Sequence, residues 1–385
     1  MTFHRPELAE QMATQLLQPS FLDTALRSGL FLSGRRRVGK TTFLASDLIP
    51  ALENKGAIVI YVDLWAQPQA NPSDVVHDAI RATLQDLELP GSGLLKRLKA
   101  GTQFEAGFAG FKFGFKTTEL GKDSAISLAK AFTELIDQAK TDVVLIVDEV
   151  QHAMGIKDGD NLLHALKATR DAVNTRPGTS GYFLFVGTGS HRARVQELAL
   201  KGNQAFNGAV THDFPLLGES FVDYVMYQVA EVLGAKLPTK TTMVQAFEHC
   251  GHRPEELMKA LHILRGIQEP IDQKTQLLTI ARTLAYASAD VELQKIEALG
   301  DLAVAVFHCV CTRDDHAKGM FSAQILGELS QQMQRDVSAT EVQTTINALV
   351  AANLVMRIGH GKYGVTDSSL EKIWREKNSI NRLEL

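Results

Sequence analysis

Cysteine is scarce in this sequence, and long apolar runs are missing. The 385 residues include only Cys250, Cys309 and Cys311, and such an odd, sparse set argues against a disulfide framework and is typical of a reducing compartment. No stretch approaches the roughly 18 continuous apolar residues that a membrane helix needs. The first residues, MTFHRPELAEQ, also lack the apolar run of a signal peptide. We therefore expect a cytoplasmic protein that does not associate with membranes.

A strong excess of one charge is missing too. Lys and Arg number 40 against 44 Asp and Glu, a formal net charge of −4, which excludes a global attraction to DNA or acidic membranes but leaves room for a local basic patch. Repeats and low-complexity tracts do not occur. With 45% hydrophobic and 22% charged residues, the composition is typical of a globular protein, and the length predicts two or three domains.

Apolar, β-branched runs alternate with helical patterns over the first 217 residues. A run such as AIVIYVDLW is continuously apolar, which predicts a strand buried on both faces. Strands separated by helices in this way indicate an α/β fold with a parallel sheet. The predicted strands span residues 30–33, 57–65, 143–149, 181–189 and 212–217.

The segment GRRRVGKTT follows the first of these strands and opens a helix, which is the context that a phosphate-binding loop requires. Glycines let backbone N–H groups approach phosphate oxygens, and the helix N-terminus adds positive potential. We expect Lys40 to reach the β- and γ-phosphates, a catalytic as well as a binding role, and Thr41 to ligate Mg²⁺. An ordinary strand–turn–helix connection is the alternative. The predicted nucleotide site comprises Gly34, Arg35, Arg36, Arg37, Val38, Gly39, Lys40, Thr41 and Thr42.

Two carboxylates end the apolar strand VVLIVDE. We expect Asp148 to hold Mg²⁺ directly or through water, and Glu149 to accept a proton from the attacking water. A solvated acidic loop is the alternative, because many strands end in acidic residues. The pairing of this strand with the phosphate loop favours a magnesium site next to a general base.

Two further segments supply candidate residues for the same site. The strand FLFVGTGS ends in Thr188 and Ser190, and ligands lie at the carboxyl ends of strands in open α/β sheets. Either hydroxyl is a candidate to sense the γ-phosphate or to position water, although a plain turn explains the segment equally well. In GHRPEEL, His252 or Arg253 is a candidate to approach the nucleotide, and the alternative is a turn with Pro254 at the first helical position.

The rest of the chain predicts helices up to residue 300, followed by three helices and a hairpin around His360 and Gly361, which is a winged-helix pattern. Residues 91–122 stand apart as an insertion. There FEAGFAGFKFGFK alternates aromatic with small or polar residues, which predicts a hairpin. Aromatic side chains that face the core are the simpler interpretation, and an exposed patch for self-association is the alternative.

Together these segments resemble the AAA+ and STAND branch of P-loop ATPases, most closely the archaeal-type ATPases and the related origin-recognition and replication-control ATPases. GRRRVGKTT resembles their phosphate loop, VDEVQH their Walker B strand, GTGS the end of their sensor-1 strand and GHRP their sensor-2 region. The likeness covers nearly the whole chain apart from the insertion. Two features depart from the pattern: Thr188 and Ser190 stand where Asn is frequent, and no arginine is a convincing finger.

The resemblance implies an ATPase core over residues 1–217, a helical lid over 218–299 and a winged-helix domain over 300–385. It also implies binding of ATP or ADP with Mg²⁺, with Arg253 reaching the nucleotide from the lid. Four arginines near the sensor-1 strand are candidates to act on a neighbouring subunit, although a solvated surface is the simpler role for each. They are Arg170, Arg176, Arg192 and Arg194.

Winged helices often bind DNA, but the charge of this one is balanced. Residues 301–385 hold nine basic and ten acidic residues, and the predicted recognition helix SATEVQTTINALVAAN has no Lys or Arg. Phosphate contacts dominate non-specific DNA affinity, so a partner-binding module is slightly favoured over a DNA-binding one. The candidate DNA contacts are Gln343, Thr344, Thr345, Arg357 and Lys362.

We therefore expect an ATP-binding, ATP-hydrolysing protein that couples its nucleotide state to a protein partner, to self-association or to DNA. One alternative is a DNA-loading or target-selecting ATPase of the replication or transposition type, and another is a nucleotide-locked signalling or defence switch with little turnover. The side chains of Arg35, Arg36 and Arg37 are expected to point away from the phosphates. They are candidates to meet an acidic patch of the lid, the winged helix or a neighbouring subunit, and a solvated surface is the alternative.

Overall fold

The computed structural model describes residues 2–101, 110–121, 127–200, 202, 204–267, 272–313, 317–359 and 361–381. Contacts divide the chain into two compact units. The first contains Met1–Gly34 and Lys40–Phe214, and the second contains Arg35–Gly39 and Pro215–Leu385. Within the described ranges, no helix is both long enough and apolar enough to span a bilayer.

The first unit is built on a five-stranded parallel sheet in the order β2-β3-β4-β1-β5. Its strands are β1 (Leu30–Ser33), β2 (Ile58–Asp63), β3 (Val143–Asp148), β4 (Phe183–Gly189) and β5 (Val210–Asp213). The predicted P-loop NTPase type of α/β fold is thus confirmed. The last strand lies earlier than the predicted 212–217, because Pro215 has no N–H to offer to a ladder.

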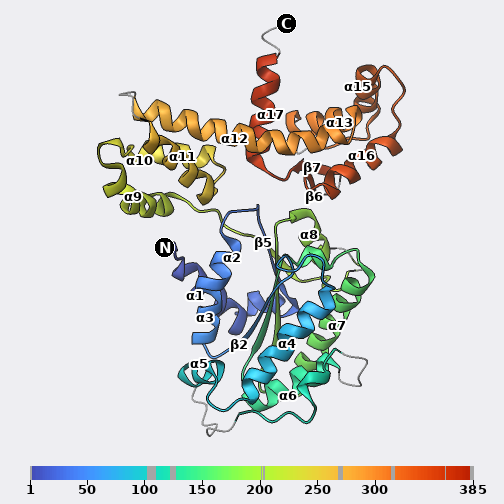
Figure 1. Cartoon of the computed structure of the whole chain (residues 1–385). Coiled ribbons are helices and arrows are strands. Elements are labelled where there is room, and N and C mark those ends of the chain that lie inside the picture. The colour runs from blue at the N-terminus through green and yellow to red at the C-terminus, as the bar shows by residue number, and fades with distance from the viewer. Residues whose placement is uncertain are drawn as a thin grey trace. The chain divides into compact units, whose positions relative to one another are not determined.

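Helices flank this sheet, and Figure 1 shows α4, α6 and α7 running beside one another along it. β2, β3 and β4 are buried over nearly their whole length, as continuous apolar strands covered by helices should be. The helices of this unit are α1 (Pro6–Leu17), η1 (Phe21–Ser28), α2 (Lys40–Phe43), η2 (Leu44–Leu48), α3 (Ile49–Asn54), α4 (Pro72–Glu88), α5 (Gly93–Gly101), η3 (Thr117–Glu119), α6 (Leu128–Ala139), η4 (Val150–Ala153), α7 (Lys157–Asn174) and α8 (Arg192–Leu200).

The helix that follows the phosphate loop changes its winding. A single helix was predicted there, but η2 is a π-helical turn between α2 and α3. Pro50 at the start of α3 explains the change, because proline cannot donate a hydrogen bond to the carbonyl four residues earlier and its ring clashes with that carbonyl. The wider turn lets the chain continue past Pro50 without breaking the helical path.

The hairpin predicted near 104–116 is wrong for the residues that the structure describes. Residues 110–116 form no strand, and residues 102–109 lie outside the described ranges. Phe111 is buried, and Phe113 and Phe115 pack against the main hydrophobic core of this unit. The alternating aromatic residues of this stretch therefore face the core, without forming a two-stranded ladder.

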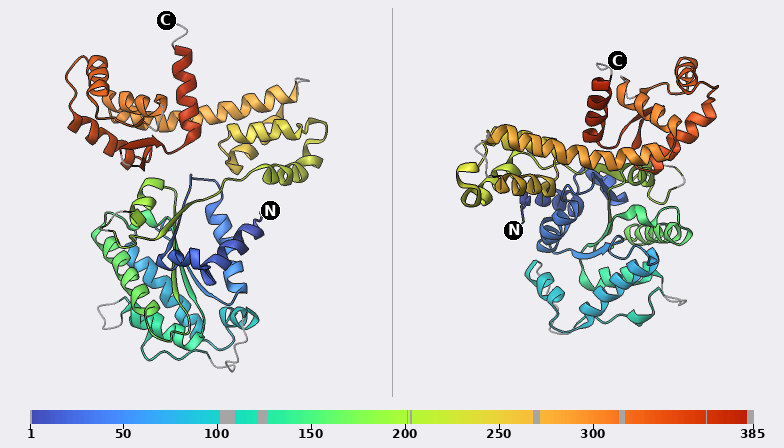
Figure 2. Two further views of the ribbon diagram at one scale, coloured as in Figure 1. Left: turned by 180° about the vertical axis from the view of Figure 1, so that it is seen from behind. Right: turned by 45° about the horizontal axis from the view of Figure 1, so that its top comes forward.

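The second unit is helical apart from one antiparallel hairpin of β6 (Val355–Gly359) and β7 (Lys362–Val365). Figure 2 shows the long helix α12 running through it. The C-terminal half of α12 shares one hydrophobic core with the helices and hairpin that follow. The helices are α9 (Glu219–Leu233), η5 (Gly234–Lys236), α10 (Lys240–His249), α11 (Pro254–Gly266), α12 (Gln273–Ala298), α13 (Asp301–Thr312), α15 (Ala323–Met333), α16 (Ala339–Ala351) and α17 (Ser368–Asn381).

The order of three helices followed by a hairpin agrees with the winged-helix pattern, while α17 was not predicted. His360 lies outside the described residues. The boundaries proposed for the lid and the winged-helix domain stay predictions, because one contact unit includes both segments.

Candidate functional site

The start of the phosphate loop is fixed to the sheet at the end of β1. The N–H of Gly34 donates to the carbonyl of Gly189 over 3.1 Å. A Cβ at Gly34 would lie only 3.0 Å from the Cβ of Phe214, so a larger residue here would crowd Phe214. Lys40 begins α2, is only 6% exposed, and donates from Nζ to the carbonyl of Gly34 over 2.9 Å.

The middle of the loop makes its contacts within the second unit. Arg35 pairs through Nη1 with Asp367 Oδ1 at 3.2 Å, and Arg37 lies 3.6 Å from Glu256. Both arginines thus meet acidic residues there, as the sequence suggested for the loop. Arg36 is exposed, whereas Val38 is buried. Thr42 is exposed on α2.

Asp148, the last residue of β3, accepts hydrogen bonds from β2, from β4, from α2 and from the next residue of its own chain. The Oγ1 of Thr41 donates to Asp148 Oδ2 over 2.7 Å, and the hydroxyl of Thr188 donates to Oδ1. The N–H of Glu149 donates to the same Oδ1 over 3.0 Å. Because β4 lies between β1 and β3, the carboxyl ends of these strands adjoin one another. The structure therefore brings Thr41, Asp148 and Thr188 together, as predicted.

Tyr61 also reaches Asp148, and the sequence gave no sign of that contact. Its hydroxyl donates to Asp148 Oδ2 over 3.3 Å. Burial raises the pKa of Tyr61, and the neighbouring charge of Asp148 raises it further. Tyr61 therefore stays a neutral donor. Only the register of β2 against β3 could have revealed this contact. That register pairs Asp63 with Asp148, which places Tyr61 two residues before the position opposite Asp148.

Glu149 turns away from the strand in a left-handed backbone conformation, with φ of 54°. Its Oε2 accepts hydrogen bonds from the Oγ of Ser190 at 2.8 Å, from the N–H of Ser190 at 3.2 Å, and from Nε2 of Gln151. Burial pushes the pKa of Glu149 upward, but these donors and the Lys40 charge outweigh it and lower the pKa below its usual value. Gln151 stands in the quoted VDEVQH segment, yet its contact was not predicted.

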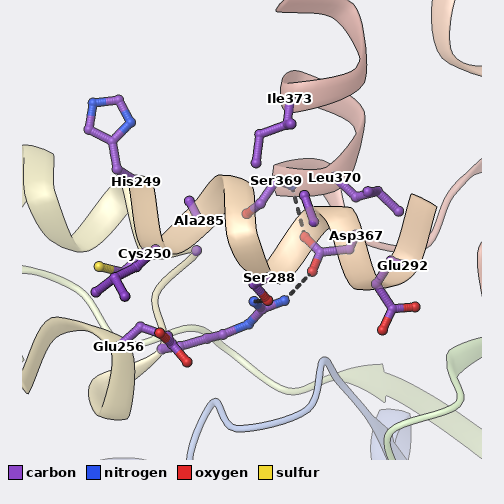
Figure 3. Close-up of a pocket in the computed structure, with 14 residues that line it drawn as sticks. His249, Cys250, Glu256, Ala285, Ser288, Glu292, Asp367, Ser369, Leu370 and Ile373 are labelled. Atoms are coloured by element: carbon purple, nitrogen blue, oxygen red, sulfur yellow. Dashed lines mark hydrogen bonds and ion pairs between the residues drawn. The ribbon is translucent and has the colours of Figure 1, made fainter. Parts of the chain in front are cut away.

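The candidate lid arginine is engaged within the second unit. Arg253 donates from Nη2 to Asp367 Oδ2 over 2.5 Å and from Nη1 to the Oγ of Ser288 over 3.1 Å. Arg253, Ser288 and Asp367 line a pocket of the second unit, and Figure 3 shows Asp367 and Ser288 close together there. His252 Nδ1 lies 3.0 Å from the carbonyl of Leu217. Arg253 therefore links the N-terminus of α11 to α12 and to the segment after β7.

Three of the four arginines near β4 form ion pairs within the first unit. Arg176 makes two bonds to Asp137, of 2.8 and 3.0 Å. Arg170 pairs with Asp171, and Arg192 pairs with Asp213. These contacts give each of the three arginines a structural role in its own chain.

Comparison with known proteins decides the family of this site. Residues 20–175 match the family model described as an ATPase domain predominantly from Archaea. This stretch is similar to archaeal-type ATPase domains. The match includes the phosphate loop and the acidic end of β3, confirms the resemblance drawn from the sequence, and supports ATPase activity in general. No curated protein matches the chain by sequence.

Solved structures are similar in fold to this chain over most of its length. The Walker-type ATPase PABY2304 of Pyrococcus abyssi is similar over 97% of this chain and 96% of its own, with a TM-score of 0.58 and 14% identity. The Aeropyrum pernix ORC2 protein is similar over 97% of this chain and 94% of its own, with a TM-score of 0.52 and 12% identity. At such identities the likeness shows the fold alone.

Proposed function

We propose that the protein binds ATP with Mg²⁺ at the carboxyl edge of its sheet, hydrolyses it in the cytoplasm, and couples the nucleotide state to a protein partner. The observation that carries this proposal is the convergence of Thr41 and Thr188 on Asp148, next to the buried Lys40. Nothing in a plain strand–turn–helix connection requires two hydroxyls to meet a buried carboxylate.

The residues of the site suit both ATP and Mg²⁺. Protein sites usually hold Mg²⁺ through one or two carboxylates and substrate phosphates, with waters completing the octahedron. Thr41 and Asp148 supply such oxygens. The described residues include no cluster of three or more His, Cys, Asp or Glu able to hold a metal without the substrate. Bound Mg²⁺ would neutralise charge on the phosphates.

The remaining roles follow from the chemistry of the side chains. The loop from Gly34 to Thr42 would bind the phosphates, with Lys40 supplying positive charge to them. Glu149 would take a proton from the attacking water, and Thr188 would orient Asp148. Arg253 stays a candidate contact for the nucleotide. The Aeropyrum pernix ORC2 structure contains ADPNP and ADP, which supports a nucleotide as the ligand here.

The test is a comparison of the wild-type protein with Glu149→Gln and Glu231→Gln. Glu231 is an exposed residue of α9 and serves as the matched control. We expect wild type and Glu231→Gln to bind ATP and release phosphate, and Glu149→Gln to bind ATP but lose turnover by about 10²- to 10⁴-fold. Failure of the wild-type protein to bind Mg-ATP in a calorimetric titration would refute the proposal.

DNA is the second candidate partner, supported by Arg357 on the β6–β7 hairpin. Arg357 is exposed, and its guanidinium lies 5.8 Å from the ring centre of Tyr363. The helix α16, ATEVQTTINALVA, offers no basic side chain to phosphate, which favours a protein partner or self-association. The mass in solution with ADP or an ATP analogue, with and without DNA, separates these outcomes. Salt-dependent DNA binding that strengthens with ATP would indicate a DNA-loading type of ATPase.

The STAND-like alternative is a switch that stays locked on its nucleotide. Purification with tightly bound ADP, together with negligible phosphate release, would establish that alternative. In both cases the open and closed arrangements must bind ATP and ADP with different affinities, because a ligand shifts an equilibrium only through such a difference.

A further inference from the structure

Gln151 is a buried polar side chain to which the proposed mechanism assigns no task. It lies in η4, two residues after Glu149, and is only 5% exposed. Its Nε2 donates to Glu149 Oε2, whereas its Oε1 has no hydrogen-bond partner among the residues that the structure describes. Burying an amide with an unsatisfied oxygen costs free energy. We therefore ask what the hydrogen bond from the Gln151 side chain to Glu149 contributes in return.

The end of β4 approaches this amide closely. A Cβ at Gly189 would lie 2.1 Å from Gln151 Oε1 and 2.6 Å from Cγ2 of Val195. Real Cβ atoms do not approach other atoms so closely. Glycine at this position therefore gives the Gln151 side chain its place beside Glu149.

The hydrogen bonds to the carboxylate of Glu149 are all made to one of its two oxygens. Gln151 Nε2, Ser190 Oγ and Ser190 N all donate to Oε2. In the described part of the chain, no hydrogen bond is made to Oε1. A carboxylate acts as a base through an oxygen with an available lone pair. In this arrangement Oε1 of Glu149 keeps its lone pairs available to accept a proton.

We propose that Gln151 is a positioning residue that, together with Ser190, holds Glu149 by Oε2 and so leaves Oε1 to take the proton from water. This inference rests on the proposed ATP hydrolysis and deepens it. In the step, the water proton moves to Oε1 and the water oxygen bonds to the γ-phosphorus. The bond from that phosphorus to the bridging oxygen breaks, and its electron pair leaves with ADP.

The test compares Gln151→Met, which keeps the length of the side chain but donates no hydrogen bond, with Gln85→Met, an exposed control on α4. We expect ATP affinity to stay within about twofold of wild type in both proteins, since neither change touches the phosphate loop. For Gln151→Met we expect kcat to fall by about 10- to 100-fold with no matching change in KM, as loss of a bond to a charged group that acts in the chemical step implies.

A second variant, Gln151→Glu, keeps the shape and places a second carboxyl beside Glu149. This carboxylate repels Glu149 instead of donating to it, so kcat should fall at least as far as in Gln151→Met. An unchanged kcat in both variants, with an active wild-type protein, would overturn the positioning role and leave the proposed ATPase intact. A wild-type protein that binds but never hydrolyses ATP would overturn both. Circular dichroism melts identify a variant that does not fold, in which case the other decides.

Discussion

The Oγ1 of Thr41 lies 2.7 Å from Oδ2 of Asp148, although 107 positions separate the two residues in the chain. Thr41 belongs to α2, the helix that follows β1 and the phosphate loop. Asp148 ends β3, which is separated from β1 in the sheet by β4. The hydroxyl of Thr188, on β4, donates to Oδ1, the other oxygen of the Asp148 carboxylate. The order of the strands thus assembles the site from segments that are distant in sequence.

Replacing Lys40 with alanine should weaken ATP binding by about 10- to 100-fold, because a charge-assisted bond to phosphate contributes about 1.5–3 kcal/mol. Titration of a fluorescent ATP analogue measures the change. Lys130→Ala, at an exposed position of α6, removes the same charge elsewhere and should bind like wild type. Equal affinity in Lys40→Ala and wild type would remove this lysine from the site.

Replacing Asp148 with asparagine should make nucleotide binding insensitive to Mg²⁺. Asp148 is only 1% exposed and accepts from Thr41, so the amide keeps the shape but loses the charge that attracts the cation. We expect ATP affinity measured with Mg²⁺ to fall to the value measured with EDTA. Asp78→Asn, on the surface of α4, is the control. A full magnesium response in Asp148→Asn would contradict the assignment.

Glu149 should make stability depend on pH in a defined window. Its pKa is lowered in the folded state, so its contribution to the free energy of unfolding is present above about pH 4.3, the usual value for the unfolded chain, and is lost as pH falls toward the lowered pKa. The wild-type protein should therefore lose more stability than Glu149→Gln between about pH 5 and pH 3. Urea unfolding at several pH values measures this. A difference that stays constant over the window would refute the expectation.

Arg253 and Asp367 should be energetically coupled. Their side chains are each 20% exposed and lie 2.5 Å apart, so a double-mutant cycle with Arg253→Met and Asp367→Asn should give about 0.5–3 kcal/mol in urea unfolding. The exposed pair of Lys295 and Glu292 on α12 is the control and should give about 0–1 kcal/mol. If both cycles give the same small value, the contact adds nothing to the stability of this unit.

Most of the fold could be predicted because its strands are continuous apolar runs separated by helical patterns. Thr41, Asp148 and Thr188 could be placed together because parallel strands end at one edge. Tyr61 and Gln151 could not be predicted, since their contacts depend on strand register and on the path of a short turn. The hairpin near residue 110 was predicted wrongly because alternation of aromatic residues is also satisfied by packing against helices, as Phe111 shows.

Gly189 carries a consequence for the evolution of this site. Glycine has no Cβ, and the space that a Cβ at position 189 would fill is taken by Oε1 of Gln151. A side chain at position 189 and the Gln151 amide therefore compete for the same space. A side chain at position 189 would displace the amide of Gln151 from its place beside Glu149. The two positions should therefore covary among relatives, and a substitution at one alone should be counter-selected wherever ATP is turned over.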